Sequence, residues 1–350
     1  MVINLALLGC GTVGLKFLEL IQEKKSDLKN RYNIELSIVG VADSTGVAID
    51  ETGLDIDQII EVKEKQRKIG LYPEKGELGV LGSGILDRVK VDVVIEAGVS
   101  DVETGGLSLE YAKKALGQGV HVVFVSKGAL VHSYDELAQI AAKHNAELKV
   151  SGATAAALPT VDVALQSLAG TEIELIQGIF NGTTNYILTQ MTQHEVSYQD
   201  ALKKAQEKGI AEPDPTNDVE GYDTASKVLI LANAVMNANL TFKDVEITGI
   251  TEVTKKQIES ARKNGQVIKL MGIVRKENGQ IKAVVKPEKL IADHPMANVH
   301  NSEKGIHFVT DTMGDLTVIG GRSDPKAAAA AALKDTIMLT QNRVAFENIG

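Results

Sequence analysis

A carboxylate and a lysine at helical spacing are the first residues in this chain that could do chemistry. Asp223 and Lys227 are four residues apart, so they share one face if the apolar run after them forms a helix. The loop before them contributes four more acids, Glu212, Asp214, Asp218 and Glu220. A lysine held beside carboxylates can act as a general acid or base. Spacing alone favours an ordinary surface ion pair, because such pairs are common and weak.

A glycine pattern near the N-terminus can hold phosphate groups. Residues 2–8 are apolar apart from Asn4, which predicts a strand buried on both faces of a parallel sheet. G-x-G-x-x-G spacing follows at once and leads into a helical pattern, which is the context in which this motif binds a dinucleotide. A tight strand-to-helix turn without a ligand is the alternative. Cys10, inside the turn, is interpreted as a small filler. The candidate cofactor contacts are Gly9, Gly11, Thr12, Val13 and Gly14.

Three more polar residues follow apolar strands, whose carboxyl ends line the crevice in a sheet of this kind. Asp43 ends the second predicted strand. It can bond a ribose 2′-hydroxyl, which favours NAD over NADP, or it can cap the following turn. Ser100 follows the third strand and is a candidate cofactor contact. Lys127 follows the fourth, either as a catalytic or cofactor-contacting residue or as a surface lysine that begins a loop.

Composition excludes several classes of protein. The chain has 350 residues, a net charge of −9 with both signs interspersed, and no Trp, which does not suit a nucleic-acid-binding protein. A single Cys excludes an intrachain disulfide and fits a reducing compartment. No apolar run reaches the length of a membrane span. We therefore expect a cytoplasmic protein without membrane or nucleic-acid partners.

The elements that must position these residues divide the chain in two. Strands and helices alternate through residue 150, which predicts an α/β fold with a doubly wound parallel sheet. Its polar insertion, 44–90, is interpreted as a solvated face without chemistry. In the second part, Thr183 and Thr184 either form an anion pocket at a helix N-terminus or simply cap that helix. Helices are also expected over 134–144, 161–168 and 186–191, and a hairpin around Asn278-Gly279.

Five segments together resemble one family, homoserine dehydrogenase. They are VINLALLGCGTVG, FVSKGAL, IFNGTTNYIL, GIAEPDPTNDVEGYDTASKVLILAN and ADHPMANVH, and the resemblance runs from residue 2 to about residue 340. It implies a Rossmann-type dinucleotide-binding domain at 1–150, completed by 320–350. It also implies an α+β domain for substrate binding and dimerisation at 151–319. The C-terminal helix would return to the first domain.

The resemblance also implies a reaction and a role for each residue. The family interconverts L-aspartate 4-semialdehyde and L-homoserine with NAD(P)H, a step of threonine and methionine biosynthesis. Lys227 resembles its proton donor and acceptor. Glu212 and Asp223 resemble the residues that hold the substrate's amino group and hydroxyl. Lys127 resembles a lysine that bridges cofactor and substrate. The residues that would line the same pocket are Gly209, Thr183 and Thr184.

The chain departs from the family pattern at two places. Many members carry a glutamate at the position of Ser151, where its side chain and later backbone carbonyls hold a monovalent cation. The carbonyls of Thr154 and Ala156 remain here, and they would bind sodium or another monovalent cation less tightly. Gly320 should lie near the cofactor, but Arg322 after it can favour a phosphate and therefore NADP.

Two other functions remain open at this stage. One is a related dehydrogenase that acts on another small amino acid or aldehyde, and the other is a non-catalytic NAD-binding sensor. The presence of both lysines together with the two acids argues against a sensor. By resemblance we expect a homodimer. Because the sequence stops at residue 350, we do not expect the regulatory amino-acid-binding domain of larger members.

Overall fold

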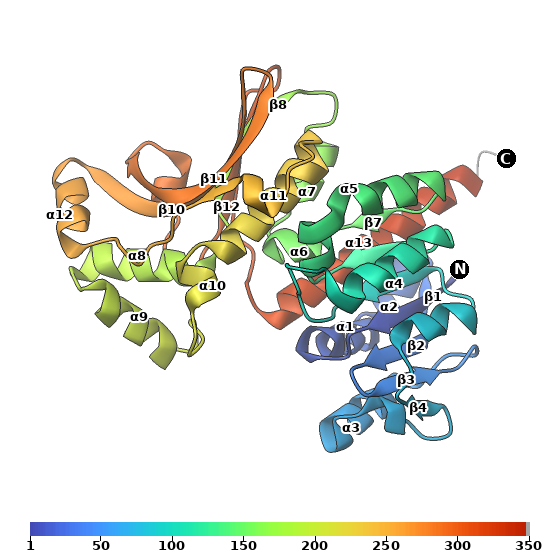
Figure 1. Cartoon of the computed structure of the whole chain (residues 1–350). Coiled ribbons are helices and arrows are strands. Elements are labelled where there is room, and N and C mark those ends of the chain that lie inside the picture. The colour runs from blue at the N-terminus through green and yellow to red at the C-terminus, as the bar shows by residue number, and fades with distance from the viewer. Residues whose placement is uncertain (348–350) are drawn as a thin grey trace. The chain divides into compact units, whose positions relative to one another are not determined.

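The computed structural model describes residues 1–347, which form two compact units (Figure 1). The first unit comprises Met1–Ala153 together with the chain from Asp324 on. The second unit comprises Thr154–Ser323. Both ends of the chain therefore contribute to the first unit, and the second unit lies between them in the sequence.

A parallel sheet forms the centre of the first unit. Its parallel strands are β1 (Val2–Leu8), β2 (Glu35–Asp43), β5 (Val93–Glu96), β6 (His121–Phe124) and β7 (Leu148–Lys149). β1 lies between β2 and β5, and the parallel pairing continues through β6 to β7. This arrangement confirms the doubly wound parallel sheet, with the carboxyl ends of β1, β2, β5 and β6 at one edge.

The segment 44–90, interpreted as a polar insertion, in fact extends this sheet. β3 (Gly46–Ile49) pairs antiparallel with β2, and β4 (Gly76–Leu78) pairs antiparallel with β3. All four residues of β3 are buried. The segment was missed because strands this short show neither alternation nor a long apolar run. It also contains α3 (Ile56–Gln66) and the short 3₁₀ helices η1 (Ile69–Leu71) and η2 (Gly82–Asp87).

Helices cover the first sheet, and the last of them comes from the C-terminal end of the chain (Figure 1). α13 (Pro325–Glu347) packs against α1 (Thr12–Glu23), and its Ala329 and Ala332 are fully buried in the same apolar core as the strands. The remaining helices are α2 (Lys25–Tyr32), α4 (Gly106–Gly117) and α5 (Gly128–Lys143). α5 begins six residues earlier than expected, because the chain turns into it directly after β6 and kinks at Ser133.

The second unit is built on a mostly antiparallel sheet. Its strands are β8 (Ile173–Ile179), β9 (Val245–Ile247), β10 (Gln266–Glu277), β11 (Gln280–Ile291), β12 (Gly305–Thr310) and β13 (Asp315–Ile319). Their order is β13-β12-β8-β10-β11-β9, and only the β11–β9 pair is parallel. The predicted hairpin is confirmed: Asn278 and Gly279 connect β10 to β11 with φ angles of 51° and 80°, the positive values that a two-residue hairpin turn requires.

Helices of the second unit pack on the β10–β11 part of its sheet. Gly272 in β10 makes room for them, because a Cβ there would lie 2.5 Å from Val228 and 2.8 Å from Phe180. The helices of the unit are α7 (Thr160–Asp162), α8 (Gly182–His194), α9 (Tyr198–Glu207), α10 (Thr216–Val219), α11 (Tyr222–Met236) and α12 (Lys255–Lys263). The short helix α6 (Ser151–Ala155) contains the point at which the chain passes from the first unit to the second. The helix expected over 161–168 is instead α7 followed by a π-helical segment, η3 (Val163–Ser167). The 3₁₀ helices η4 (Phe242–Asp244) and η5 (Pro295–Asn298) complete the unit.

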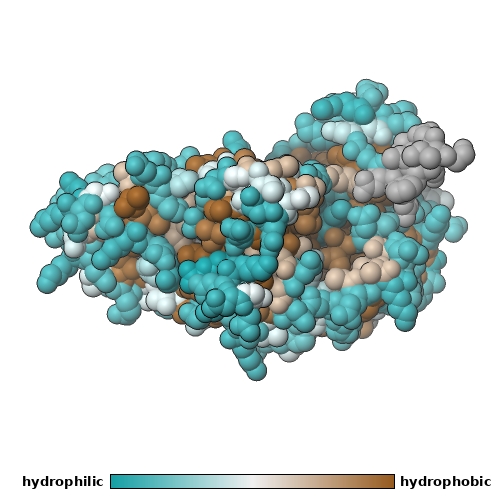
Figure 2. Space-filling model, turned by 90° about the horizontal axis from the view of Figure 1, so that it is seen from above, coloured by the Kyte–Doolittle hydropathy of each residue, from teal (hydrophilic) through white to brown (hydrophobic). Residues whose placement is uncertain are grey.

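The described surface mixes hydrophilic and hydrophobic side chains. The face drawn in Figure 2 is largely teal, with smaller brown areas of hydrophobic residues between the hydrophilic ones. Among the described residues, no helix is both long enough and apolar enough to cross a bilayer.

Candidate active site

Lys227 and Asp223 form the predicted pair at the start of α11. The Lys227 ammonium donates to a carboxylate oxygen of Asp223 at 2.5 Å and to the carbonyl oxygen of Phe180 at 2.9 Å. Only 16% of the Lys227 side chain and 12% of the Asp223 side chain are exposed. The surface ion pair favoured by spacing alone is therefore wrong, because the carboxyl end of β8 covers this turn of the helix.

Asn181, which the sequence analysis did not select, links the acids of this site. Its side-chain nitrogen donates to Asp223 at 2.9 Å and to Asp218 at 2.6 Å. Its side-chain oxygen accepts from the backbone N–H of Thr184, so Asn181 is the N-cap of α8. One amide thus fixes a helix start and holds two carboxylates together. An Asn directly after an apolar strand and before a helix is a signal that could have identified it.

The two threonines lie in the first turn of α8, so the alternative that either caps the helix is wrong. α8 begins at Gly182, four residues earlier than expected, because Asn181 already supplies the cap. The Thr184 hydroxyl donates back to Asn181 and is buried. The Thr183 hydroxyl donates to the carbonyl oxygen of Ile210 at 3.1 Å, which ties the acidic loop to the N-terminus of α8.

The acidic loop between α9 and α11 is shaped by two glycines. Gly209 follows α9 with a φ of 67°, and Gly221 precedes α11 with a φ of 87°. Both values lie in the left-handed region that glycine adopts without strain. Between them, Glu212 is exposed, and its backbone carbonyl accepts from Gln206 at 3.2 Å. The loop therefore presents Glu212 to solvent beside a helix start that is already crowded with acids.

In the first unit, each of the three glycines after β1 has different surroundings that explain why its position has no side chain. Gly9 has a φ of 107°, and a Cβ there would lie 2.4 Å from the backbone of Ala97. A Cβ at Gly14 would lie 2.3 Å from the Gly9 carbonyl oxygen, which explains the close helix–strand packing. A Cβ at Gly11 would meet no described atom within 4 Å, so this glycine faces open space. Open space beside the first N–H groups of α1, which include those of Thr12 and Val13, fits a pyrophosphate.

Cys10 is inert, as its interpretation as a filler requires. It is 1% exposed, and burial raises the pKa of its thiol to about 12, against the weaker opposing effect of nearby Lys63. A thiol with that pKa carries almost no thiolate at neutral pH, and the thiolate is the reactive form.

The carboxyl ends of β5 and β6 are tied together by Glu96, which the sequence analysis also missed. Glu96 is 1% exposed; it accepts from the Gly98 N–H at 2.9 Å and from the Ser126 hydroxyl. Burial raises the pKa of Glu96, against these hydrogen bonds, which lower it. Next to Ser126, the backbone N–H of Lys127 donates to the Ser100 hydroxyl at 2.9 Å. The structure thus places Ser100 and Lys127 at the sheet edge where the glycine turn begins, as predicted from their strands.

Asp43 accepts four hydrogen bonds within the first unit. One carboxylate oxygen accepts from the N–H of Thr45 at 2.8 Å and from its hydroxyl at 2.6 Å. The other accepts from the Ile69 N–H at 3.0 Å and from the Lys63 ammonium. The turn-capping alternative is therefore confirmed. The interpretation of the 44–90 charges as a solvated face is wrong for Lys63, whose side chain is 12% exposed.

The remaining predicted residues lie in the second unit: Thr154 near the end of α6, Ala156 in the turn that follows it, and Gly320 after β13. Thr154 shares a hydrogen bond of 2.8 Å with Thr160, and Ala156 adopts a left-handed φ of 52°. The backbone N–H of Gly320 donates to the carbonyl oxygen of Lys304 at 3.0 Å. Among the described residues, no cluster of three or more His, Cys, Asp or Glu side chains is arranged to hold a metal ion.

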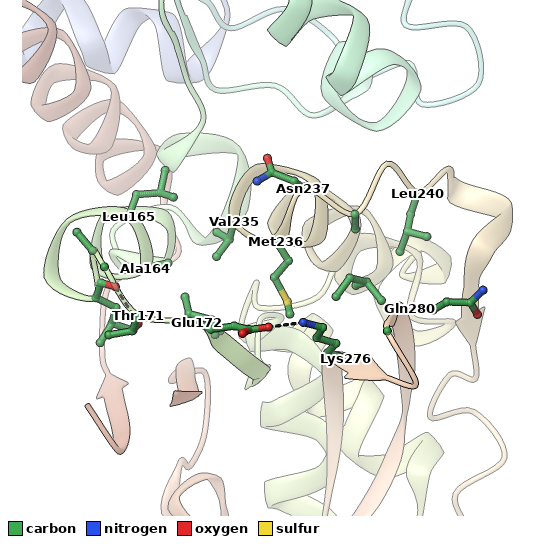
Figure 3. Close-up of a pocket in the computed structure, with 17 residues that line it drawn as sticks. Ala164, Leu165, Thr171, Glu172, Val235, Met236, Asn237, Leu240, Lys276 and Gln280 are labelled. Carbon is green, nitrogen blue, oxygen red and sulfur yellow. Dashed lines mark hydrogen bonds and ion pairs between the residues drawn. The ribbon is translucent and has the colours of Figure 1, made fainter. Parts of the chain in front are cut away.

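A groove of about 820 Å³ in the second unit lies apart from these residues (Figure 3). It is lined by Leu165, Val235, Met236 and neighbouring residues, and an ion pair between Glu172 and Lys276 crosses it. Lys227 lies near the start of α11, whereas the groove reaches that helix only at Val235. Eight residues of helix place these two positions about 12 Å apart along its axis. The groove is therefore not the site that holds Lys227.

Comparisons with known proteins cover almost the whole chain. The family model described as homoserine dehydrogenase matches residues 159–337, and the one described as homoserine dehydrogenase, NAD binding domain, matches residues 9–151. A homoserine dehydrogenase of Methanocaldococcus jannaschii is 40% identical over 334 residues, which are 95% of this chain and 97% of that protein.

Solved structures agree with the sequence relatives. A provisionally named homoserine dehydrogenase from Archaeoglobus fulgidus is 32% identical, with a TM-score of 0.87 over 96% of this chain and 99% of its own. A hyperthermophilic archaeal homoserine dehydrogenase in complex with NADPH is 27% identical, with a TM-score of 0.80 over 98% of each chain.

Proposed function

The chain belongs to the homoserine dehydrogenase family and is an NAD(P)-dependent oxidoreductase, and we propose that Lys227 carries the proton in its reaction. Oxidation of L-homoserine to L-aspartate 4-semialdehyde removes a hydride from C4 and a proton from the C4 hydroxyl. The nicotinamide of NAD(P), when bound, accepts that hydride and returns it in the opposite direction. The protein must supply a group that takes the proton and gives it back.

The contacts of Lys227 support this role. An ammonium has three N–H donors, and the Phe180 carbonyl and the Asp223 carboxylate orient two of them. The third is then directed by the other two and can meet the substrate oxygen. Asp223 contributes by holding the lysine in place, while Asn181 holds Asp223. This is the single arrangement that carries the proposal, because a surface lysine would have no such fixed orientation.

Substrate recognition follows from the charges around this lysine. The α-ammonium of homoserine requires a carboxylate, and the exposed Glu212 of the acidic loop supplies one. The substrate carboxylate requires hydrogen-bond donors, which the N-terminus of α8 beside Thr183 and Thr184 supplies through its N–H groups. Gly209 sets the direction of the loop. These assignments rest on family resemblance together with the local contacts described above.

We assign the cofactor's pyrophosphate to the glycine turn after β1, where Gly11 leaves open space at the start of α1. Ser100 and Lys127, at the ends of β5 and β6, would border the crevice on that edge. Lys127 then has the role that the resemblance implies, between cofactor and substrate. Gly320 is kept as a further candidate contact.

Asp43 supports the use of both NAD and NADP. Burial raises the pKa of Asp43, but the hydrogen bonds from Lys63, Thr45 and Ile69 outweigh it and hold that pKa below its ordinary value. The group is therefore an anion at neutral pH, and the Lys63 ammonium compensates its charge. An acid at this position selects NAD by repelling the 2′-phosphate of NADP. Compensation by Lys63 weakens that repulsion, so we expect the preference for NAD to be small.

A homodimer in the cytoplasm remains part of this proposal. The second unit offers a sheet edge at β13, where Ile319 is 48% exposed, and such an edge is a surface on which copies can pair. The buried, inert Cys10 is compatible with a reducing compartment. Light scattering during gel filtration measures the oligomeric state directly, and a monomeric mass would exclude the dimer.

The role of Lys227 is tested by following NAD(P)H formation from L-homoserine with NAD⁺ and, separately, with NADP⁺. Lys227→Met keeps the length of the side chain but removes the proton carrier. We expect kcat to fall by about 10² to 10⁴, the usual contribution of a general acid or base, with a much smaller change in KM. Lys256→Met, at an exposed position on α12, is the matched control and should retain wild-type kcat.

Two results would contradict the proposal in different ways. Wild-type kcat in the Lys227 variant would remove the lysine from the mechanism but leave the activity intact. No turnover by the wild-type protein with either cofactor would remove the activity itself.

A further inference from the structure

Lys304 is a buried lysine for which the proposed reaction has no use. It is 2% exposed and directly precedes β12. Its ammonium donates to the carbonyl oxygen of Ala155 and, at 3.4 Å, to the carbonyl oxygen of Arg322. Burying a charge is costly unless fixed dipoles or counter-charges replace its water. Here backbone carbonyls supply those dipoles, which is also how proteins hold alkali cations.

The carbonyls belong to two turns that pack against each other. The first turn ends α6 and continues through Ala156 with its left-handed φ of 52°. The second contains Gly321, at which a Cβ would lie 2.5 Å from the backbone nitrogen of Leu158. Gly320 also donates to the carbonyl oxygen of Lys304. The ammonium therefore joins two backbone turns, and the second requires glycine for their close approach.

These turns flank the two points at which the chain passes between its units. The crossings fall after Ala153 and after Ser323. Ala155 lies two residues beyond the first crossing, and Arg322 lies one residue before Ser323. The Lys304 ammonium thus bonds to both connecting segments where they enter and leave the second unit. These segments are far apart in the sequence.

The first of these turns is also the segment predicted to hold a monovalent cation through the carbonyls of Thr154 and Ala156. The residues present do not fit an inorganic cation there. The ammonium of Lys304 already donates to the carbonyl of Ala155, between those two residues, and would repel a second cation. The Ser151 hydroxyl, at the position of the family's glutamate, donates to Asp335 at 2.9 Å and accepts from Lys334 at 2.9 Å. The Asp335 carboxylate at this position is already paired with the Lys334 ammonium at 2.8 Å, so it does not balance an added charge.

We propose that the Lys304 ammonium is the built-in monovalent cation of this turn, so that the protein needs no Na⁺ or K⁺ for stability or activity. A tethered cation binds its carbonyls without the loss of translational freedom that a free ion incurs. The proposal concerns the two turns alone and does not depend on Lys227 as the proton carrier.

The first test uses the wild-type protein. Its Tm is measured without substrate in choline chloride, NaCl and KCl at equal ionic strength. Its kcat/KM for L-homoserine is then measured in the same three salts. We expect both quantities to be the same in all three salts. A Tm or activity that rises with Na⁺ or K⁺ but not with choline would overturn the proposal. Because Tm needs no turnover, this result is independent of whether the proposed mechanism is correct.

The second test removes the tethered cation. Lys304→Met should lower Tm by about 5–10 °C in choline chloride, the scale expected when a buried charged hydrogen-bonding group is lost from a domain of this size. The vacated carbonyls should then bind a small cation, so K⁺ or Na⁺ should restore Tm in a saturable way, by mass action. If the Tm of the variant is lower by the same amount in all three salts, Lys304 has a structural role only, and the proposal would be wrong.

Lys269→Met is the matched control for a buried lysine. Lys269 is 3% exposed in the same unit, and its ammonium donates to Asn185 at 2.9 Å and to the carbonyl oxygen of Val299. Its Tm should fall without specific recovery by K⁺ or Na⁺, because its ligands are one side-chain amide oxygen and one backbone carbonyl rather than the carbonyls of two packed turns. Should Lys304→Met fail to fold, Lys304→Ala replaces it, since it also vacates the carbonyls and leaves more room beside them for a cation. Equal recovery of the Lys269 and Lys304 variants would count against the proposal.

Discussion

At the scale of single residues, the site depends on the side-chain amide of Asn181, which takes no part in proton transfer and carries no charge. Asn181 caps α8 with its oxygen and holds Asp218 and Asp223 with its nitrogen. Two carboxylates bonded to one nitrogen repel each other, and the amide N–H groups reduce that repulsion. Lys227 depends on Asp223 for its orientation, so Asn181 acts on the lysine through its neighbour and is a positioning residue.

Replacing Asn181 by Ser separates its two functions. Serine is about as good an N-cap as asparagine, so the contribution of the cap to the free energy of unfolding should change by less than about 0.5 kcal/mol. Its hydroxyl cannot bridge the two acids. We therefore expect kcat to fall on the order of tenfold to a hundredfold, the effect of a small displacement of a catalytic group, with a smaller change in KM. Steady-state kinetics and chemical denaturation on the same preparation measure both quantities.

Asn181→Ala is the companion variant, because it loses the cap as well. Its free energy of unfolding should lie about 1 kcal/mol below that of the serine variant, while the kcat values of the two variants should match. A serine variant with wild-type kcat would show that the bridge between the acids does not position Lys227.

At the scale of elements, the cofactor side is organised by strand ends. β5 and β6 end side by side, and Glu96 accepts from a backbone N–H after its own strand and from Ser126 after the next. The same strand end meets the glycine turn, since a side chain at Gly9 would collide with Ala97. The buried carboxyl group of Glu96 therefore holds together the ends of β5 and β6, and Lys127 directly follows Ser126 at this sheet edge.

The burial of Glu96 predicts a pH dependence of stability. Because burial raises its pKa in the folded state above the ordinary 4.5, the folded protein holds this proton more tightly than the unfolded chain. The stability that this proton contributes is complete below pH 4.5 and is lost as pH rises through the folded-state pKa. Glu96→Gln is neutral at every pH. The Tm of the variant minus that of the wild type should therefore become more positive between pH 5 and pH 8.

The subtraction removes the contribution of other titrating groups to the pH dependence of Tm, because both proteins contain the same groups. Differential scanning calorimetry across this pH range measures the difference. A value that becomes more negative as pH rises would mean that the carboxylate, rather than the carboxylic acid, stabilises this strand end.

The elements also show what the sequence could reveal about the fold and the site. The spacing of Gly9, Gly11 and Gly14 was sufficient to predict the turn, because each glycine acts within a few residues of its own position. The Asp223–Lys227 pair was predictable for the same reason. The partnership of Asp43 with Lys63 was not, because Lys63 lies twenty residues further along the chain, in α3, with the short strand β3 between them. The bridging role of Asn181 was also hidden, since Asp218 and Asp223 reach it only after α8 and α11 have packed on the sheet.

At the scale of the whole molecule, the first unit is completed by the end of the chain. The second unit is inserted between β7 and α13, so the sheet can be covered only after about 170 intervening residues have been made. The alanines of α13 make that closure tight, and Ala329 and Ala332 lie in one core with Leu5, Leu7 and Phe17. Such long-range contacts form slowly and are sensitive to added volume.

Ala329→Leu tests this closure. Ala329 is fully buried, so three extra carbon atoms should overpack the α13 face and lower the free energy of unfolding of the first unit by about 1–3 kcal/mol. Ala330→Leu is the matched control, because the adjacent residue is exposed and the change should have little effect. Calorimetry with and without NADH identifies the relevant transition, since a bound cofactor raises the Tm of the unit that binds it. We expect Ala329→Leu to lower that transition alone, and equal shifts in the two variants would show that α13 does not close the cofactor-binding unit.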